Sequence, residues 1–341
     1  MTPNPPVLAS AGILLAVLLD RCLGDPLHWP HPVVVMGWWI TRLRQWAEAW
    51  AQDSPTRLRL GGLAITLIVV SGSCLSGWWI EQLAQGRWIS EQHWLMLIAQ
   101  LLLVIGLASA LAGRSLEQAV MAVLSALASN NQALARQRLQ WIVGRDTSEL
   151  NPDEILRAAA ETAAENAVDG LFTPLFWMLA GLVVWQINPH WPGSLALAWG
   201  FKAASTLDSM LGYRTGRLNW LGTAGAKLDD LLVWPACRLV MLSLPLVSAP
   251  WKLWPQLVSA AERDGKHDPS PNAGRAEAIY AHCAGVRLGG RNRYGDRWVI
   301  KPLLAAAQPA PNREGVMRIL RFSQRLELAW LLFPLAMALR G

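Results

Sequence analysis

The segment GRDTSELNPDEILRAAAETAAENAVDGLFTPLFW, residues 144–177, decides how this chain is organised. Asn151 is placed to cap a helix, and Pro152 suits the first helical position. Asp153 and Glu154 put negative charge near the positive end of the helix dipole. The sequence therefore predicts a helix that begins at Asn151.

Charged side chains recur at every fourth position of this predicted helix, as Arg157, Glu161, Glu165 and Asp169. That spacing places them on one side of the helix, while the intervening alanines keep the helix thin. An apolar run starts at Leu171, so three acids stand where a membrane surface is expected and where charge is usually kept for function. The alternative is a solvated face with one Arg157–Glu161 ion pair, a contact that contributes only about 0.3–0.5 kcal/mol.

The composition indicates an all-α, polytopic membrane helical bundle. A hydrophobic content of 53% with only 16% charged residues is unusual for a soluble protein. Tryptophan is the dominant aromatic residue, with 20 copies against five Phe and three Tyr, and indoles favour the headgroup layer of a bilayer. We expect one integral-membrane domain over residues 1–341, with probable spans at 5–23, 60–80, 92–113, 171–187 and 193–206. The first apolar segment lacks a basic leader and is interpreted as a retained span.

Charge and cysteine usage narrow the function classes. The net charge is +6, but the sequence has no basic stripe interleaved with aromatic residues, so we expect no nucleic acid partner. Binding to anionic lipid or to a phosphorylated ligand would explain the positive charge equally well. The four cysteines are scattered without a CxxC pair, which indicates neither a zinc site nor a disulfide framework. His28 and His31 have a helical metal spacing, but Pro26, Pro30 and Pro32 predict a loop or re-entrant piece there.

The distribution of Lys and Arg predicts the topology. By the positive-inside rule, residues 41–59 are cytoplasmic and 81–91 external, which puts the acidic helix on the cytoplasmic side. Residues 252–326 carry thirteen Lys and Arg, so we interpret 231–251 as re-entrant or interfacial and expect 328–339 to pack in the interface or the bundle. Residues 114–141 are expected to form a helical hairpin that turns at Asn130 and Asn131.

Four polar blocks fall on this predicted cytoplasmic side. They are residues 145–147 with the acidic helix, 202–208, 227–230 and 264–294. One of the adjacent Asp229 and Asp230 is placed to hold magnesium, which prefers carboxylate, water and phosphate oxygens. Residues 270–274 form a turn with free amides, and the Gly289–Gly290 pair beside several arginines is able to wrap a phosphate. No GxxxxGK[ST] or GxGxxG motif is present.

Seven collinear blocks resemble the CobD/CbiB family of cobalamin-biosynthesis membrane proteins and cover nearly the whole chain. They are DRCLGDPLHWPHPV (20–33), GRDT (144–147), AxETAAENAVDGLFTPLFW (160–177), KAASTLDSMLGY (202–213), AKLDDLLVWPACRL (226–239), SPNAGRAEA (270–278) and RLGGRNRYG (287–295). The resemblance implies an enzyme that uses ATP to join adenosylcobyric acid to (R)-1-amino-2-propanol or its O-phosphate, giving adenosylcobinamide or its phosphate. Ser205 and Lys227 depart from the residues usual in the family, which puts a ligand contact at each in doubt.

Such a ligation needs an activated acyl group, magnesium to shield the phosphates of ATP, and a base for the amine. The resemblance does not assign these roles to single residues. We assign them from the residue type and from the side of the membrane on which each residue is predicted to lie. The expected catalytic residues are Glu161, Glu165, Asp169 and Asp208. The expected magnesium ligands are Asp208, Asp229 and Asp230. The expected substrate- and phosphate-binding residues are Arg145, Asp146, Thr147, Asn166, Lys202, Ser270, Asn272, Arg287, Gly289, Gly290 and Arg291.

Two other classes of function stay open. A membrane sensor or accessory protein resembling AmpE would need the fold but neither SPNAGRAEA nor RLGGRNRYG. A corrinoid transporter would explain polar residues within the membrane, yet the charged motifs lie between the spans. We expect an inner-membrane protein with its active site on the cytoplasmic face, in contact with lipid. Other membrane-bound enzymes of the pathway and a second copy of the chain are further expected partners.

Overall fold

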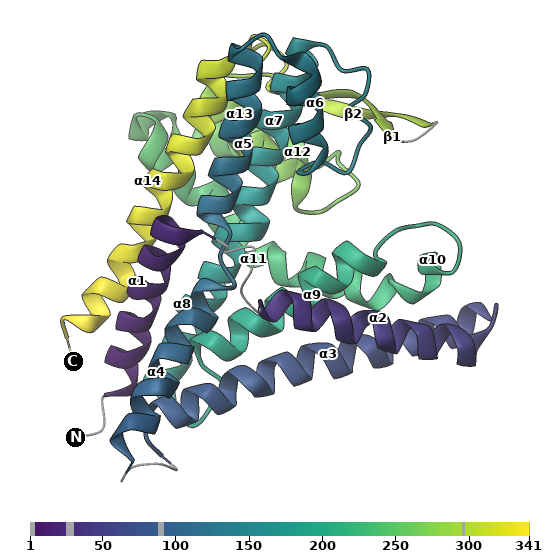
Figure 1. The fold of residues 1–341 in the computed structure, drawn as a ribbon. Helices are drawn as coiled ribbons and strands as arrows, with labels where there is room; N and C mark the ends of the chain where they lie inside the picture. Colours follow the sequence, from purple (N-terminus) through teal and green to yellow (C-terminus); the bar gives the residue numbers. More distant parts are fainter. Residues whose placement is uncertain (1–3, 25–30, 88–91, 295–296, 341) are drawn as a thin grey trace. The chain divides into compact units, whose positions relative to one another are not determined.

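The computed structural model describes residues 4–24, 31–87, 92–294 and 297–340, and the regular secondary structure within them is helical except for one β-hairpin (Figure 1). The all-α class expected from composition is confirmed. The chain forms two compact units, each assembled from segments that are distant in sequence. Unit 1 comprises residues 1–112, 173–232 and 331–341, and unit 2 comprises 113–172 and 233–330. Of the loop predicted around Pro26, Pro30 and Pro32, residues 25–30 including His28 lie outside the described residues, whereas Pro32 begins a helix, so the prediction is wrong there.

Unit 1 consists of long apolar helices. Several begin with proline in the first turn, where the missing N–H is not needed. Its elements are α1 (Pro5–Leu23), α2 (Pro32–Ala51), α3 (Pro55–Ala84), α4 (His93–Ala108), α8 (Thr173–Ile187), α9 (Ser194–Leu211), α10 (Leu218–Leu221), the start of α11 (Thr223–Ser248) and the end of α14 (Arg313–Ala338).

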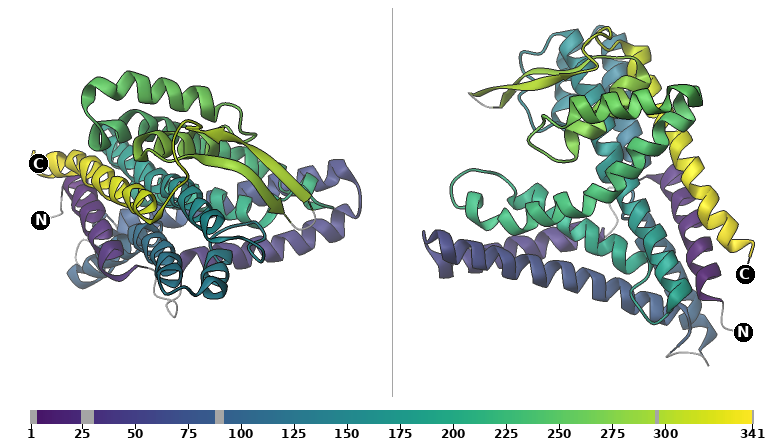
Figure 2. Two further views of the ribbon diagram at one scale, coloured as in Figure 1. Left: turned by 90° about the horizontal axis from the view of Figure 1, so that it is seen from above. Right: turned by 180° about the vertical axis from the view of Figure 1, so that it is seen from behind.

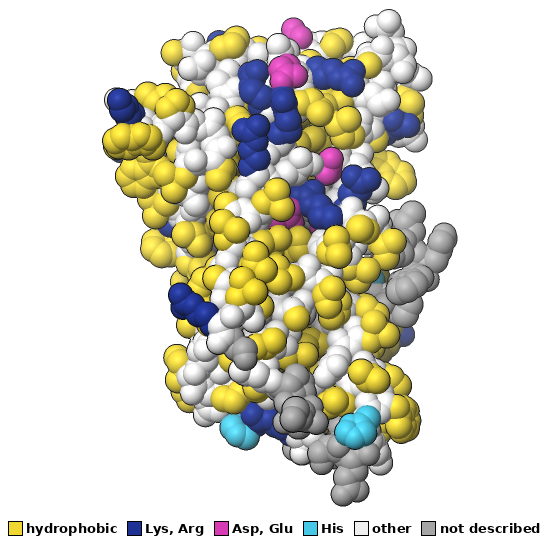
Figure 3. Space-filling model, turned by 90° about the vertical axis from the view of Figure 1, so that its left-hand side faces the viewer, with side chains coloured by type: hydrophobic (Ala, Val, Ile, Leu, Met, Phe, Trp, Pro, Cys, Tyr) yellow, Lys and Arg dark blue, Asp and Glu magenta, His cyan; other side chains and the backbone are white. Residues whose placement is uncertain are grey.

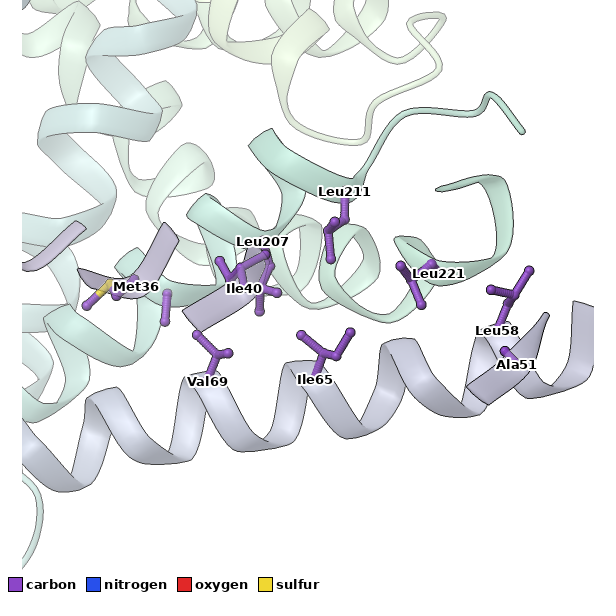
Figure 4. Packing of buried hydrophobic residues seen from close by; sticks show 10 residues of the cluster. Met36, Ile40, Ala51, Leu58, Ile65, Val69, Leu207, Leu211 and Leu221 are labelled. Carbon is purple, nitrogen blue, oxygen red and sulfur yellow. The ribbon is translucent and has the colours of Figure 1, made fainter. Parts of the chain in front are cut away.

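One core of unit 1 lies where α2, α3, α9 and α10 meet. Figure 4 shows side chains from these helices, such as Ile40, Ile65 and Leu207, directed into a shared layer. Gly62 on α3 permits the closest approach, because a Cβ at that position would lie 1.9 Å from the carbonyl oxygen of Leu221. A side chain there would therefore push α10 away from α3.

A buried carboxylate fastens the turn between α8 and α9. Glu81 of α3 accepts hydrogen bonds from the backbone N–H groups of Gly193 (2.8 Å) and Leu195 (2.6 Å). These N–H groups belong to the first turn of α9 and have no partner within the helix. Glu81 thus caps α9 from a helix more than one hundred residues earlier in the chain.

Unit 2 contains the acidic helix, and α7 (Pro152–Ala167) passes through the short π-helix η1 (Val168–Phe172). Its other elements are α5 (Gly113–Ala128), α6 (Gln132–Gln140), η2 (Trp251–Leu253), α12 (Trp254–Gly265), α13 (Ala273–Ala284), β1 (Leu288–Tyr294), β2 (Arg297–Leu304) and the remaining parts of α11 and α14. The strands are antiparallel, and Figures 1 and 2 show this hairpin beside α12 and α13.

The helical hairpin expected at 114–141 is confirmed as α5 and α6. Asn130 adopts a left-handed conformation with φ +55°, which asparagine tolerates better than most residues. The Asn131 side chain then accepts a hydrogen bond from the N–H of Leu134 and caps α6. Two adjacent asparagines therefore make the turn and start the next helix.

Five helices are long and apolar enough to cross a membrane, as expected for a multi-pass membrane protein. They are Pro5–Leu23, Pro55–Ala84, His93–Ala128, Pro152–Ile187 and Thr223–Ser248. Leucine and isoleucine side chains are exposed along α3 and α4, and Figure 3 shows hydrophobic side chains over much of one face. Such surfaces suit lipid contact.

These helices differ from the expected spans at two places. The predicted span at 193–206 belongs to α9, which carries Lys202 and Asp208 and is not among the five. Residues 231–248 belong to the continuous helix α11, although Pro235 and Pro245 lie within it. The length and composition of α11 also suit a membrane crossing, so the re-entrant placement of 231–251 stays a prediction.

Candidate functional site

The acidic helix α7 begins as its sequence predicts. The Asn151 side chain accepts a hydrogen bond from the N–H of Glu154 (3.0 Å), and the Glu154 carboxylate accepts one from the N–H of Asn151 (2.9 Å). This reciprocal capping box satisfies two N–H groups at the helix start. The alanines of α7 are fully buried, and α5, α6, α13 and β1 all contact the helix. A thin helix thus brings its few polar side chains close to several neighbours.

Glu161 is the most heavily engaged acid of α7. Its Oε2 lies 2.7 Å from Nη2 of Arg145, and its Oε1 lies 3.2 Å from Nη1 of Arg157. Oε1 also accepts a hydrogen bond from the N–H of Gly289 at 2.9 Å. The predicted Arg157–Glu161 ion pair is present, but the Glu161 side chain is only 7% exposed. The alternative of a solvated helix face is therefore wrong at Glu161.

The two glycines of β1 allow the hairpin backbone to contact Arg157 and Glu161. Gly289 and Gly290 have φ +81° and +99°, and the strand register shifts between Leu288 and Gly290. A Cβ at Gly289 would lie 1.9 Å from the carbonyl oxygen of Pro302, so no other residue fits without displacement. Arg157 donates to the carbonyl oxygens of Gly289 (2.7 Å) and Arg291 (2.9 Å). Arg157 and Glu161 thus hold both polar groups of Gly289.

A second buried pair joins α13 to β2. Lys301 Nζ lies 3.0 Å from Oε1 of Glu277 and 3.7 Å from Oδ2 of Asp268. The Glu277 side chain is 1% exposed, and its Oε2 makes no hydrogen bond with any residue that the structure describes. An unsatisfied buried carboxylate oxygen is costly, so a buried site of this kind points to a ligand group or a proton.

The charges around this pair set its protonation. Burial raises the pKa of Glu277 to about 8 against the opposing effect of Lys301, and the Glu165 and Glu161 carboxylates raise it further. Burial lowers the pKa of Lys301, but Glu277, Glu165 and Asp268 together bring it above its ordinary value. At neutral pH the lysine is therefore charged, and the Glu277 carboxyl holds a proton for much of the time.

These side chains surround one pocket of about 230 Å³ within unit 2. Asn166 is oriented there by a chain of hydrogen bonds, because its Nδ2 donates to Thr162 Oγ1 (2.8 Å), which donates to the Ile142 carbonyl oxygen (2.7 Å). Three carboxylates and two cations line the pocket with Asn166, Thr162 and Tyr294; they are Glu161, Glu165, Glu277, Arg145 and Lys301. The predicted meeting of the 144–169 region with the 264–294 region therefore occurs in unit 2.

Other predicted residues of unit 2 support the walls of the pocket. Asp146 joins the hairpin, since its N–H donates to the Arg293 carbonyl oxygen at 2.9 Å. A hydrogen bond from Ser148, together with nearby Arg293, keeps the pKa of Asp146 below its usual value. Thr147 Oγ1 donates to the Arg136 carbonyl oxygen (3.0 Å) and thereby fixes the same loop to α6.

The turn at 270–274 starts α13 and thereby positions Glu277. Ser270 Oγ accepts hydrogen bonds from the N–H groups of Asn272 (3.3 Å) and Ala273 (3.2 Å). Asn272 is buried beside Arg238 of α11, with its Oδ1 3.4 Å from Nη1. The amides of this turn are therefore partly used within the protein.

Three further predicted residues of unit 2 also lie outside the pocket lining. Asp169 lies in η1, Arg287 is exposed at the start of the hairpin, and Arg291 stacks on the Trp298 ring with its guanidinium carbon 3.7 Å from the ring centroid. Their proposed contacts with substrate stay predictions.

The remaining predicted residues form a separate polar cluster in unit 1. Asp208 lies near the end of α9 and Asp229 and Asp230 near the start of α11, while Lys202 lies in the middle of α9. Gly225 permits this approach, since a Cβ there would lie 3.0 Å from Cβ of Leu207. Burial raises the pKa of Asp208, and the nearby Asp230 raises it further.

The unit 1 cluster has the donor chemistry of a magnesium site but lacks its arrangement. Asp229 Oδ1 is buried without a hydrogen bond, and carboxylate oxygens are what magnesium prefers. Among the described residues, however, no three His, Cys, Asp or Glu side chains are arranged to hold a metal ion. These side chains as placed do not form a metal site, and magnesium binding here stays a prediction.

Sequence reasoning missed Glu277, Lys301, Asp268 and Tyr294 as parts of the site. Glu277 lies inside the SPNAGRAEA block, and its signal was a single acid among small residues on a buried helix. Lys301 was detectable as the one cation of the apolar stretch WVIKPLL. Neither pattern indicates that Glu277 and Lys301 form a pair, because their contact depends on how the hairpin packs against α13.

The chain matches a family model described as CobD/Cbib protein over residues 13–323. It is 41% identical to the cobalamin biosynthesis protein CobD of Synechocystis sp. over 85% of this chain and 80% of that protein. It is 35% identical to the cobalamin biosynthesis protein CbiB of Salmonella arizonae and 36% identical to the CobD of Klebsiella pneumoniae, each over 95% of this chain and 94% of the relative. No solved structure matches.

Proposed function

Because the chain belongs to the CobD/CbiB family of cobalamin biosynthesis proteins, we propose that it catalyses an ATP-dependent amide ligation in that pathway. The acid would be adenosylcobyric acid, and the amine (R)-1-amino-2-propanol or its O-phosphate. The product would be adenosylcobinamide or its phosphate. The observation that carries the proposal is the charged pocket of unit 2, where Glu165 and Glu277 stand beside Arg145 and Lys301.

The chemistry requires two steps. The corrinoid carboxylate oxygen attacks the γ-phosphorus of ATP, which forms an acyl phosphate and releases ADP. The amine nitrogen then attacks the acyl carbon, so that a C–N bond forms, the C–O bond to phosphate breaks and inorganic phosphate leaves. The proton lost by the nitrogen must pass to a base.

The residues of the pocket suit the second step. Glu165 lines the pocket beside Arg145 and Lys301, and we assign its carboxylate the role of the base. Glu161 is held by two arginines and the Gly289 N–H, and we assign it the role of positioning Arg145. Arg145 and Lys301 would neutralise the acyl phosphate and the departing phosphate. Magnesium would accompany ATP and shield its phosphate charge.

The test is conversion by the purified full-length protein in lipid nanodiscs. The assay contains adenosylcobyric acid, ATP, magnesium and either (R)-1-amino-2-propanol or its O-phosphate, and mass spectrometry follows the corrinoid. We expect a mass gain equal to the amine minus water, dependent on ATP, and its loss in Glu165→Gln. An AmpE-like accessory protein would leave the mass unchanged. A transporter would move corrinoid into vesicles without altering its mass.

We also propose that the protein resides in the inner membrane with the pocket of unit 2 on the cytoplasmic side. The many Lys and Arg of residues 252–326 support this orientation. Single cysteines at exposed positions Glu149 and Lys266, in a background without the native cysteines, should react with a membrane-impermeant maleimide only in inverted vesicles. Labelling of either position in right-side-out vesicles would reverse the orientation.

A further inference from the structure

Three exposed arginines on the surface of unit 1 lie over tryptophan rings. They are Arg42 over Trp38, Arg57 over Trp50 and Arg59 over Trp220, with distances of 5.5, 6.0 and 4.5 Å from guanidinium carbon to ring centroid. These six residues form the Arg–Trp patch. Trp38 and Trp50 are 50% and 56% exposed, so the patch presents indole surface as well as positive charge.

The acids of this region are paired with other arginines. Oε1 of Glu48 lies 2.7 Å from Nε of Arg44, and Oδ1 of Asp53 lies 2.8 Å from Nη2 of Arg217. Residues 38–59 contain no further Asp or Glu. The patch therefore keeps a positive charge that no acid of residues 38–59 neutralises.

The packing of α2 against α3 brings the parts of the patch together. The two helices run side by side and are joined by residues 52–54 (Figures 1 and 2). A Cβ at Gly61 of α3 would lie 3.0 Å from Cβ of Ala47 on α2, and Ala51 lies beside Leu58 in the shared core (Figure 4). Because α10 also contacts α3, three helices contribute to one surface.

The patch ends where an apolar surface of α3 begins. No Asp, Glu, Lys or Arg follows Arg59 until Glu81, and α3 is one of the helices long and apolar enough to cross a membrane. Leu60, Leu63 and Leu67 lie on one side of α3 and are 47–58% exposed. Arginine and tryptophan at the edge of such a surface lie at the level of the lipid headgroups.

We infer that the Arg–Trp patch binds the phosphate groups of anionic phospholipids. A guanidinium that stacks on an indole keeps the N–H groups at its edge available, and a phosphate accepts them in pairs. A zwitterionic headgroup brings its own cation, whereas an anionic headgroup leaves its charge for the arginines. The inference concerns unit 1 and does not rest on the proposed function.

Nucleic acid is the other polyanion that arginine and tryptophan bind together, through phosphate contacts and base stacking. The position of the patch favours lipid. Its surface continues directly into the exposed leucines of α3, which suit acyl chains and offer nothing to a nucleotide.

The experiment titrates the full-length protein in mild detergent with phosphatidylglycerol or phosphatidylcholine of identical acyl chains. Native mass spectrometry measures the dissociation constant of each lipid. We expect phosphatidylglycerol to bind at least about tenfold more tightly, and this preference to fall about fivefold for each arginine replaced. The triple variant Arg42→Gln, Arg57→Gln, Arg59→Gln should bind both lipids alike. The matched control for Arg59→Gln is Lys266→Gln, which removes one exposed charge from unit 2 and should keep the preference.

Equal affinity of the wild type for the two lipids would overturn the inference, as would an unchanged preference in the triple variant. Glycerol 3-phosphate carries the phosphate without acyl chains and should not bind measurably. Binding of this compound, or of a single-stranded oligonucleotide, with the same dependence on the three arginines would assign the patch to a soluble anion or to nucleic acid. Thermal unfolding checks that the variants fold. If the triple variant does not fold, Arg42→Gln decides, because the Arg42–Trp38 contact lies on the surface of a single helix.

Discussion

Glu81 of unit 1 and Glu277 of unit 2 are both buried carboxylates, but they differ in how their oxygens are satisfied. Glu81 accepts backbone hydrogen bonds at both oxygens from the first turn of α9, and among the described residues it makes no ion pair. Glu277 shares one oxygen with Lys301 and leaves the other without a partner at a pocket. A satisfied buried carboxylate is explained by folding alone, whereas one with an unsatisfied oxygen calls for a ligand group or a proton.

The largest effect should follow the loss of the structural carboxylate. Glu81→Ala leaves two or three buried N–H groups without an acceptor, so we expect a loss of about 3–5 kcal/mol in the free energy of unfolding. The midpoint of thermal unfolding in detergent should fall by about 5 °C or more. Glu81→Gln keeps one acceptor oxygen and should lose less. An Ala variant as stable as the wild type would show that α9 does not depend on this cap.

The second prediction concerns Gly289. The unit 2 site depends on this glycine, just as the start of α9 in unit 1 depends on Glu81. Gly289→Ala combines φ +81° with a clash against Pro302, and we expect a cost of roughly 2–4 kcal/mol with loss of the Glu161 contact. Thermal unfolding measures the cost. Gly216→Ala is the matched control for backbone strain, since φ is +52° and no atom lies within 4 Å. If the two variants lose equal stability, the clash with Pro302 does not contribute to the cost of Gly289→Ala.

This contrast also shows what could be predicted from the sequence. The start of α7 at Asn151 and the turn at Asn130 were predictable, because each depends on side chains within three residues of the backbone groups that they satisfy. The acids of α7 were predictable from their spacing. The contacts of Glu81 with Gly193 and of Glu161 with Gly289 join positions more than one hundred residues apart. Local patterns do not specify such pairs.

The position of α11 shows a different limit. Pro235 and Pro245 are residues that usually break a helix, yet α11 continues through both. A proline removes one hydrogen bond and bends a helix, but apolar surroundings that offer no other partner for the backbone keep the chain helical. The polar cluster at Asp208, Asp229 and Asp230 was recognised from residue type, whereas the placement of its carboxylates depends on the packing of α9 against α11.

The third prediction uses pH to test the protonation of Glu277. The pKa of Glu277 rises from 4.5 to about 8 on folding. A raised carboxyl pKa contributes stability that is fully present below about pH 4.5 and is lost as pH rises through about 8. Glutamine does not titrate, so the unfolding midpoint of the wild type relative to Glu277→Gln should fall steadily from pH 5 to pH 8.5. A constant difference across this range would mean that Glu277 does not exchange its proton there.

The smallest effect on stability is expected at the exposed edge of the hairpin. Arg291 stacks on Trp298, which is 54% exposed, and an exposed cation–π contact contributes about 0.5–1 kcal/mol. Arg291→Ala should therefore lower stability by no more than about 1 kcal/mol, because Arg157 binds only the backbone of Arg291.

If Arg291 also contacts phosphate, as its sequence context predicts, the KM for ATP should rise about tenfold with little change in unfolding. Arg291→Lys keeps the charge but not the planar stack, so it should restore the KM more than the stability. An unchanged KM in both variants would confine Arg291 to the hairpin and leave the phosphate contacts to Arg145 and Lys301.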